Sequence, residues 1–97
     1  MIDRKSVLLS AQRALLGNIS PNLRAVSIGF TEQSISIRFY YETQPSEIEY
    51  DLVDSITSEI LADFDHINNI DEEIIVTQEK ANQLNGLNDW IYLRFEP

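Results

Sequence analysis

The sequence has no cysteine, and its 97 residues include only three glycines, three prolines and one histidine. Without cysteine there is no disulfide, thiolate nucleophile or Cys-based zinc site, which agrees with a reducing compartment. The scattered glycines form neither a phosphate-binding loop nor a dinucleotide-binding pattern, and no G-x-S-x-G motif occurs. Asp63, Asp65 and His66 are close in sequence, but no second histidine follows at a ligand spacing. We therefore expect no catalytic residue, no metal site and no cofactor.

Positive charge is also scarce. Seven lysines and arginines stand against 16 aspartates and glutamates, so the formal net charge is -9. Such an excess repels phosphate backbones, and we expect no direct binding of nucleic acid. The same charge attracts a basic protein surface, although many acidic proteins use charge only for solubility.

Long apolar runs are missing as well. No segment approaches the roughly 18 apolar residues that span a bilayer, and Ser10, Gln12 and Arg13 interrupt the leucines near the start. We expect a soluble, cytoplasmic protein without a membrane partner. The hydrophobic fraction of 43% is nevertheless ordinary for a globular chain, so residues 1–97 should form a single α+β domain with a packed core.

Two segments have the apolar spacing of amphipathic helices. Asp3 is a suitable N-cap for the first, whose apolar residues recur at steps of three and four and which ends near Gly17. The second extends from Pro45 to Phe64, and Ser46 and Glu49 have the spacing of a capping box at its start. The apolar stripe that we expect to cover a sheet consists of Ile48, Leu52, Val53, Ile56, Ile60 and Phe64.

Four segments alternate apolar and polar residues as strands do. The first two, 23–30 and 35–41, are separated by a short connection that predicts a hairpin. The third, which includes Ile74 and Val76, follows an acidic lead-in, and the fourth occupies 90–95. Residues 78–89 are polar and aperiodic, so we expect a long exposed loop with a mobile tip.

The predicted order of elements is α-β-β-α-β-β. Short connections favour antiparallel neighbours, and two apolar helix faces need a sheet to cover. We therefore expect a four-stranded antiparallel sheet with two helices packed on one face. The pattern leaves the order of the strands across the sheet open.

Acidic residues on the second helix and after it form the first candidate binding surface. Their carboxylates would attract a basic partner, and a nuclease toxin is one example, because its active site is built to attract phosphate. A solvated charged face without a partner is the alternative. The residues of this candidate surface are Glu47, Asp51, Asp54, Asp63, Asp71 and Glu72.

The sheet face away from the helices is the second candidate. If Ile91, Leu93 and Phe95 point toward the helices, the residues between them point the other way. That face would combine aromatic rings with guanidinium groups, a composition typical of binding hot spots, although such pairs also stabilise solvated sheets. Its residues are Arg38, Tyr40, Trp90, Tyr92 and Arg94.

Several short segments resemble a group of small acidic bacterial proteins that includes immunity proteins of polymorphic toxins and of contact-dependent growth inhibition systems. They lie between Leu15 and about Val76 and are Leu15-Leu16-Gly17, Pro21-Asn22-Leu23-Arg24-Ala25-Val26, Ile37-Arg38-Phe39-Tyr40, Pro45-Ser46-Glu47 and Ala62-Asp63-Phe64. The resemblance implies a cytoplasmic, non-catalytic protein that binds and neutralises a toxin domain. It assigns no catalytic residue and leaves the binding surface to the two candidates.

We therefore predict a toxin-neutralising binding protein whose partner is a basic toxin domain. The alternative is a self-associating structural or regulatory domain, a homodimer in which Tyr40, Trp90 and Tyr92 meet across a two-fold axis. A small hydrolase or metal protein is a third hypothesis, for which the sequence offers little beyond abundant carboxylates.

Overall fold

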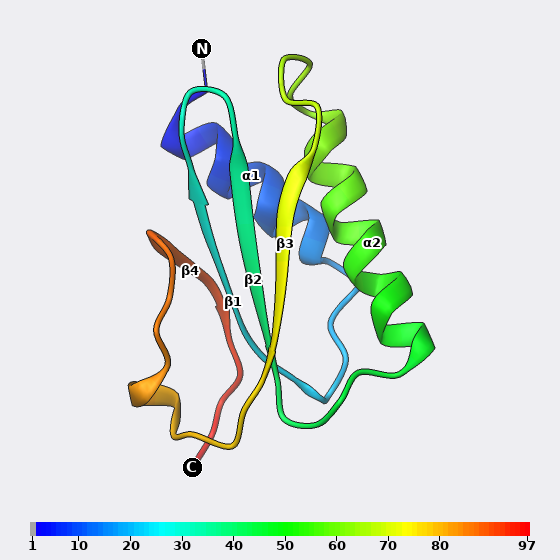
Figure 1. Ribbon diagram of the computed structural model, residues 1–97, viewed down its shortest axis with the longest axis vertical. Coiled ribbons are helices and arrows are strands. Elements are labelled where there is room, and N and C mark those ends of the chain that lie inside the picture. The colour runs from blue at the N-terminus through cyan, green and yellow to red at the C-terminus, as the bar shows by residue number, and fades with distance from the viewer. Residues whose placement is uncertain (1) are drawn as a thin grey trace.

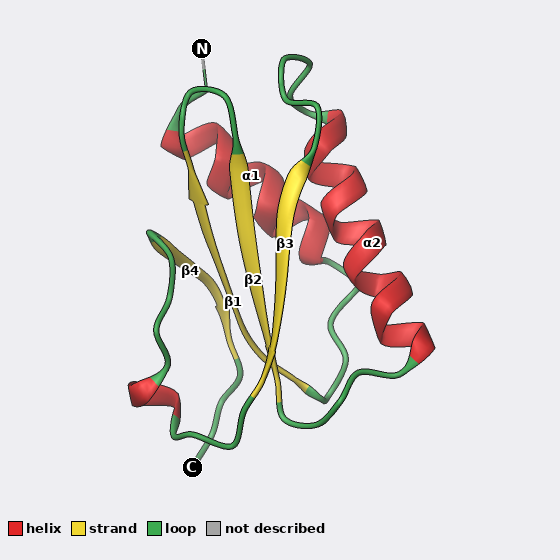
Figure 2. Cartoon of the chain, in the orientation of Figure 1, coloured by secondary structure: helices red, strands yellow, loops and turns green. Residues whose placement is uncertain are grey.

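A computed structural model describes residues 2–97 of the chain, and it confirms the predicted α-β-β-α-β-β order (Figures 1 and 2). A short 3-10 helix, η1, is inserted in the last connection. The elements are α1 (Arg4–Leu15), β1 (Leu23–Phe30), β2 (Ile35–Tyr41), α2 (Glu47–Ala62), β3 (Ile70–Val76), η1 (Ala81–Gln83) and β4 (Asp89–Leu93). Neither helix of the described chain is long and apolar enough to cross a membrane.

The sheet is mixed, and the prediction of a purely antiparallel sheet is wrong. The strand order is β3-β2-β1-β4, in which β1 pairs antiparallel with β2 and β4 while β2 and β3 are parallel. The cause is α2, which carries the chain back along the sheet, so that β3 starts at the same end as β2. Short connections favour antiparallel neighbours, but β2 and β3 are joined by a helix of 16 residues, which is long enough for a parallel crossover.

The helix starts are set by the caps that the sequence predicts. The side chain of Asp3 accepts a hydrogen bond of 2.8 Å from the amide of Ser6 at the start of α1. At the other end of α1, Gly17 has a φ of 78°, a left-handed conformation that glycine adopts without the steric cost of a Cβ. Ser46 and Glu49 form the predicted capping box of α2, each side chain accepting from the other's amide.

Both helices pack on the same face of the sheet, behind it in the view of Figure 1. The core between the layers contains Val7 and Ala11 of α1 together with Val53 and Ile56 of α2. The strand residues of this core are Leu23, Val26, Ile28, Ile35, Ile37, Phe39 and Tyr41. The predicted alternation of β1 and β2 is therefore confirmed on their helix-facing side.

Two residues of the predicted α2 stripe are not part of the core. Ile48 is 72% exposed, so its assignment to the buried stripe is wrong, and Leu52 is only partly buried. Figure 1 shows the reason: the first turn of α2 lies to the side of the strands, where no sheet is available to cover it.

Candidate partner-binding surfaces

The outer face of α2 carries three of the predicted acidic residues. Glu47, Asp51 and Asp54 are all exposed. Glu72 of β3 is joined to the same helix, because its carboxylate accepts a hydrogen bond of 2.7 Å from Thr57 of α2. We call these four carboxylates, Glu47, Asp51, Asp54 and Glu72, the acidic helix face.

The other two predicted acids lie elsewhere. Asp71 pairs in register with Ser36, whereas Glu72 pairs with Ile37 of the core, so their side chains point to opposite faces of the sheet. Asp63 caps α2 and is held by α1, since it accepts a bond of 2.6 Å from Ser10 and pairs with Arg13 at 3.3 Å. The structure thus divides the six predicted acids into one group of four and two separate residues.

The cationic residues are distributed unequally over the molecule. Each of the five arginines forms an ion pair with an acid of the same chain, and the pairs are Arg4–Asp89, Arg13–Asp63, Arg24–Glu96, Arg38–Glu73, Arg94–Glu42 and Arg94–Glu96. By contrast, α2 contains five acidic residues and no lysine, arginine or histidine. The negative charge that is not balanced locally is therefore concentrated around α2.

The second predicted surface is not open. Tyr40 is 2% exposed, because the segment between β3 and β4 lies against it. The Tyr40 hydroxyl and Nη1 of Arg38 both donate to the backbone carbonyl of Asn85, the latter at 2.8 Å, and the amide of Leu87 donates to Ser27 Oγ at 3.1 Å. Most residues of 78–89 are exposed, as predicted, but Asn85 and Leu87 bond to the sheet face that was expected to stay open.

The side chains of β4 also depart from simple alternation. The pairing of β1 with β4 is irregular between Val26 and Ser27, which face Tyr92 and Trp90 respectively. This bulge places Ile91 and Tyr92 together against the helix-side core, while Trp90 lies on the other face with its ring centroid 5.5 Å from that of Tyr40. The prediction that Tyr92 lies beside Trp90 is wrong.

Arg94 belongs to an ionic cluster at the end of the sheet. Its guanidinium contacts Glu42 at 2.9 Å and Glu96 at 2.8 Å, and Glu96 also pairs with the buried Arg24 at 2.7 Å. The hydrogen bonds from Arg24, aided by those from Arg94, lower the pKa of Glu96 to about 2, despite an opposing effect of burial. Arg94 is thus paired with two carboxylates of its own chain.

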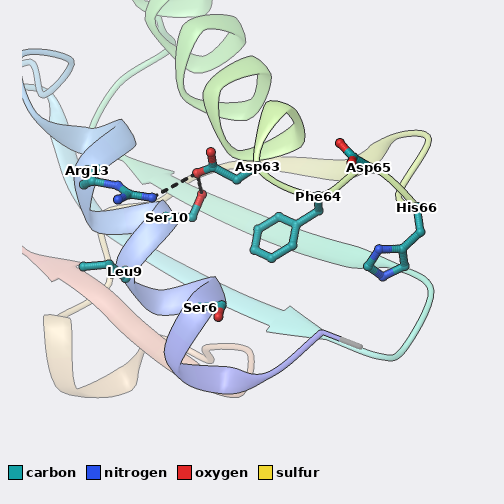
Figure 3. A pocket seen from close by; sticks show the side chains of 8 residues that line it. All are labelled: Ser6, Leu9, Ser10, Arg13, Asp63, Phe64, Asp65 and His66. Atoms are coloured by element: carbon teal, nitrogen blue, oxygen red, sulfur yellow. Dashed lines mark hydrogen bonds and ion pairs between the residues drawn. The ribbon is translucent and has the colours of Figure 1, made fainter.

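A hollow of about 480 Å³ is lined by residues of α1 and of the segment that follows α2 (Figure 3). Ser10 and Arg13 point toward Asp63 across it, while the His66 ring lies apart, with Nε2 3.2 Å from the carbonyl of Glu32. Asp63 and His66 therefore do not converge on a common point. Within residues 2–97 no group of three His, Cys, Asp or Glu side chains is arranged to hold a metal ion.

A family model for the MafI2 immunity protein matches residues 4–96. The chain belongs to the MafI2 immunity protein family. The resemblance to immunity proteins of polymorphic toxins that the sequence shows is thereby confirmed. A search of curated proteins finds no match.

One exposed surface of this MafI2 family member combines Trp90 and Arg94, which were predicted to lie on the second candidate surface, with residues that were predicted to lie elsewhere. A second hollow, of about 660 Å³, lies between η1 and the end of β4 and is largely apolar. Its apolar lining consists of Ala81, Leu84, Trp90, Leu93 and Phe95. The sequence pattern placed Leu93 and Phe95 on the helix side, but they are 57% and 87% exposed. No local signal marks the bulge that turns β4 outward.

Proposed function

We propose that this chain is the immunity protein of a bacterial toxin system and neutralises its cognate toxin by binding a basic surface of the toxin domain with the acidic helix face. Membership in the MafI2 immunity protein family supports the function. The observation that supports the surface is the position of the unbalanced charge: the arginines neutralise acids on the other elements, and α2 has no cation of its own.

The proposed partner is a toxin domain with a cationic active site, and a nuclease has such a site because it must attract phosphate. Exposed carboxylates accelerate the encounter with a cationic surface and suppress binding of acidic proteins. The face is also well ordered, because the capping box fixes the first turn of α2 and Thr57 ties α2 to Glu72. A helix whose backbone is already ordered loses little backbone entropy on binding.

Co-expression tests the function. The toxin domain encoded beside this gene should arrest growth, and this chain should restore growth by forming a stable complex that is detected on co-purification. If the neighbouring domain is not toxic, or if the chain gives no protection and no complex, the proposed function is wrong.

A competition experiment tests the surface. For a nuclease toxin, a short DNA duplex and this chain should exclude one another, because both occupy the cationic site. A ternary complex of toxin, DNA and this chain would place inhibition outside the active site. It would contradict the proposed surface while leaving the immunity function intact.

A further inference from the structure

The apolar hollow beside β4 is bordered by the most exposed aromatic side chain of the described chain. Phe95 follows β4 and is 87% exposed, and Leu93 and Trp90 continue the same surface toward the sheet. Together with Leu84 they form the β4 surface, which lies at an edge of the sheet because the strand order ends with β4. Contiguous exposed apolar surface of this kind marks a contact with another protein.

The central aromatic of the β4 surface is held rigidly. One side of the Trp90 indole packs on Tyr40, with 5.5 Å between ring centroids. Its benzene ring is so close to Gly86 that a Cβ at this glycine would stand 2.6 Å from the Trp90 ring carbon Cζ2. An aromatic anchor that is already fixed in the free protein contributes to binding without a further loss of side-chain entropy.

The charges around the β4 surface cancel, in contrast to those of α2, which has acids and no cation. The cations near β4 and η1 are Arg4, Arg24, Lys80 and Arg94, and the acids among them are Glu42, Glu79, Asp89 and Glu96. These eight side chains add no net charge, so the formal charge of -9 belongs to the rest of the molecule. A strongly basic partner therefore finds its attraction at α2, whereas β4 is the surface on which a second acidic copy meets least repulsion.

We infer that the β4 surface is the contact of a homodimer, in which two copies of this chain pack their β4 surfaces together around a two-fold axis. Such an isologous contact places the same residues of both copies opposite one another. Phe95 of each copy reaches from the rim of its own hollow into the hollow of the other, against Leu84 and Leu93. The acidic helix faces of both copies stay free.

Sedimentation equilibrium of the full chain over a range of concentrations tests the homodimer. The wild type should move from a mass of 11.2 kDa to twice that mass as the concentration rises. Leu93→Glu should raise the dimer Kd at least tenfold, because it places a carboxylate in each apolar contact, and Phe95→Ala should also weaken the dimer. Leu16→Glu is the matched control, since Leu16 is also an exposed leucine, at the end of α1, and the change in charge is the same.

Salt gives a second readout. A contact made by apolar groups between two chains of like charge should not weaken when NaCl is raised from about 0.1 M to about 0.5 M, because screening reduces only the repulsion. A dimer that dissociates in salt, or that responds equally to Leu93→Glu and Leu16→Glu, contradicts the inference. So does a wild type that stays at 11.2 kDa up to about 1 mM.

Measuring toxin binding by the same variants provides the remaining outcome. If the wild type is monomeric and Leu93→Glu abolishes toxin binding, the β4 surface belongs to the toxin and the homodimer is ruled out. Failure of the immunity function itself has a different signature, since it removes toxin binding by the wild type and leaves sedimentation unchanged.

Discussion

Arg24 and Glu96 form a bidentate ion pair, with 2.8 Å from Nε to Oε2 and 2.7 Å from Nη2 to Oε1. Arg24 is buried at 5% exposure, and its third polar contact, from Nη1 to the carbonyl of Thr77 at 3.0 Å, connects β1 to the end of β3. The pair thereby fastens the C-terminal tail to the centre of the sheet. Loss of Glu96 would leave a buried guanidinium without its carboxylate.

The pKa of Glu96 yields a prediction of pH dependence. Because the folded-state pKa is about 2 and the ordinary value is 4.5, the unfolded chain binds the proton more readily, and the pair stabilises the fold above about pH 4.5. This contribution disappears as the pH falls toward 2. We expect Glu96→Gln to lower the free energy of unfolding by about 1–2 kcal/mol at pH 7. The difference from wild type should shrink toward zero near pH 2 in denaturant titrations.

Glu32→Gln is the control for this experiment, because Glu32 is exposed and forms no ion pair within residues 2–97. Its effect on stability should be small at every pH. A stability difference for Glu96→Gln that persists unchanged at pH 2 would show that the carboxylate charge is not the cause.

The bond from Tyr40 to the carbonyl of Asn85 predicts slow hydrogen exchange of backbone amides in the segment between β3 and β4. Tyr40→Phe removes one of the two donors to this carbonyl and should lower the free energy of unfolding by about 1 kcal/mol. Hydrogen exchange of the Leu87 amide, which donates to Ser27, should accelerate. Tyr50→Phe serves as the control because Tyr50 is exposed and its hydroxyl contacts only the side chain of Gln44. Equal exchange rates in wild type and Tyr40→Phe would mean that this bond does not hold the loop.

The N-terminal cap of α2 predicts a local stability effect. Ser46→Ala removes the acceptor of the Glu49 amide and should cost about 1 kcal/mol in thermal or denaturant unfolding. Ser58→Ala, at an exposed position in the middle of the same helix, should be neutral or slightly stabilising because alanine has the higher helix propensity. If both variants behave alike, the cap does not stabilise α2.

Charge reversal on the acidic helix face should act on the rate of association. Asp51→Lys combined with Asp54→Lys should slow binding of a basic toxin about tenfold at low salt and flatten its salt dependence, with little effect on dissociation. The matched control is Glu32→Lys with Asp71→Lys, which changes the net charge equally on segments away from α2. Equal slowing by both pairs in stopped-flow measurements would assign the effect to total charge instead of to this face.

Elements whose cause is local were predictable from the sequence. Asp3, Gly17 and the Ser46–Glu49 pair act within one helical turn, so their residue types and spacing suffice to locate the helix ends. The β1–β2 hairpin is likewise confirmed, because its alternation and its short connection agree. The predicted direction of β3 is wrong, because the connection from β2 to β3 contains the helix α2 and a connection of that length joins parallel strands.

The candidate surfaces depend on contacts that a pattern does not contain. A single extra residue in β4 sends Tyr92 to the core and leaves Leu93 and Phe95 exposed, and strict alternation cannot reveal such a bulge. The polar composition of 78–89 predicts exposure, but the bonds to Tyr40 and Arg38 use the backbone carbonyl of Asn85, which every residue type possesses. The distribution of charge could not be predicted either. Composition gives the net charge of -9, but only the fold shows which acids the arginines pair with.

The strand order also has a consequence for how the protein folds. The β1–β2 hairpin closes over a short turn, whereas Arg24 and Glu96, which join β1 to the tail after β4, are 72 residues apart in sequence. Closing so long a chain segment costs more entropy than closing a hairpin, so we expect β4 to join the sheet late in folding and to detach early when the native protein opens locally. The pair between Arg24 and Glu96 can consequently form on a newly synthesised chain only after Glu96 has left the ribosome.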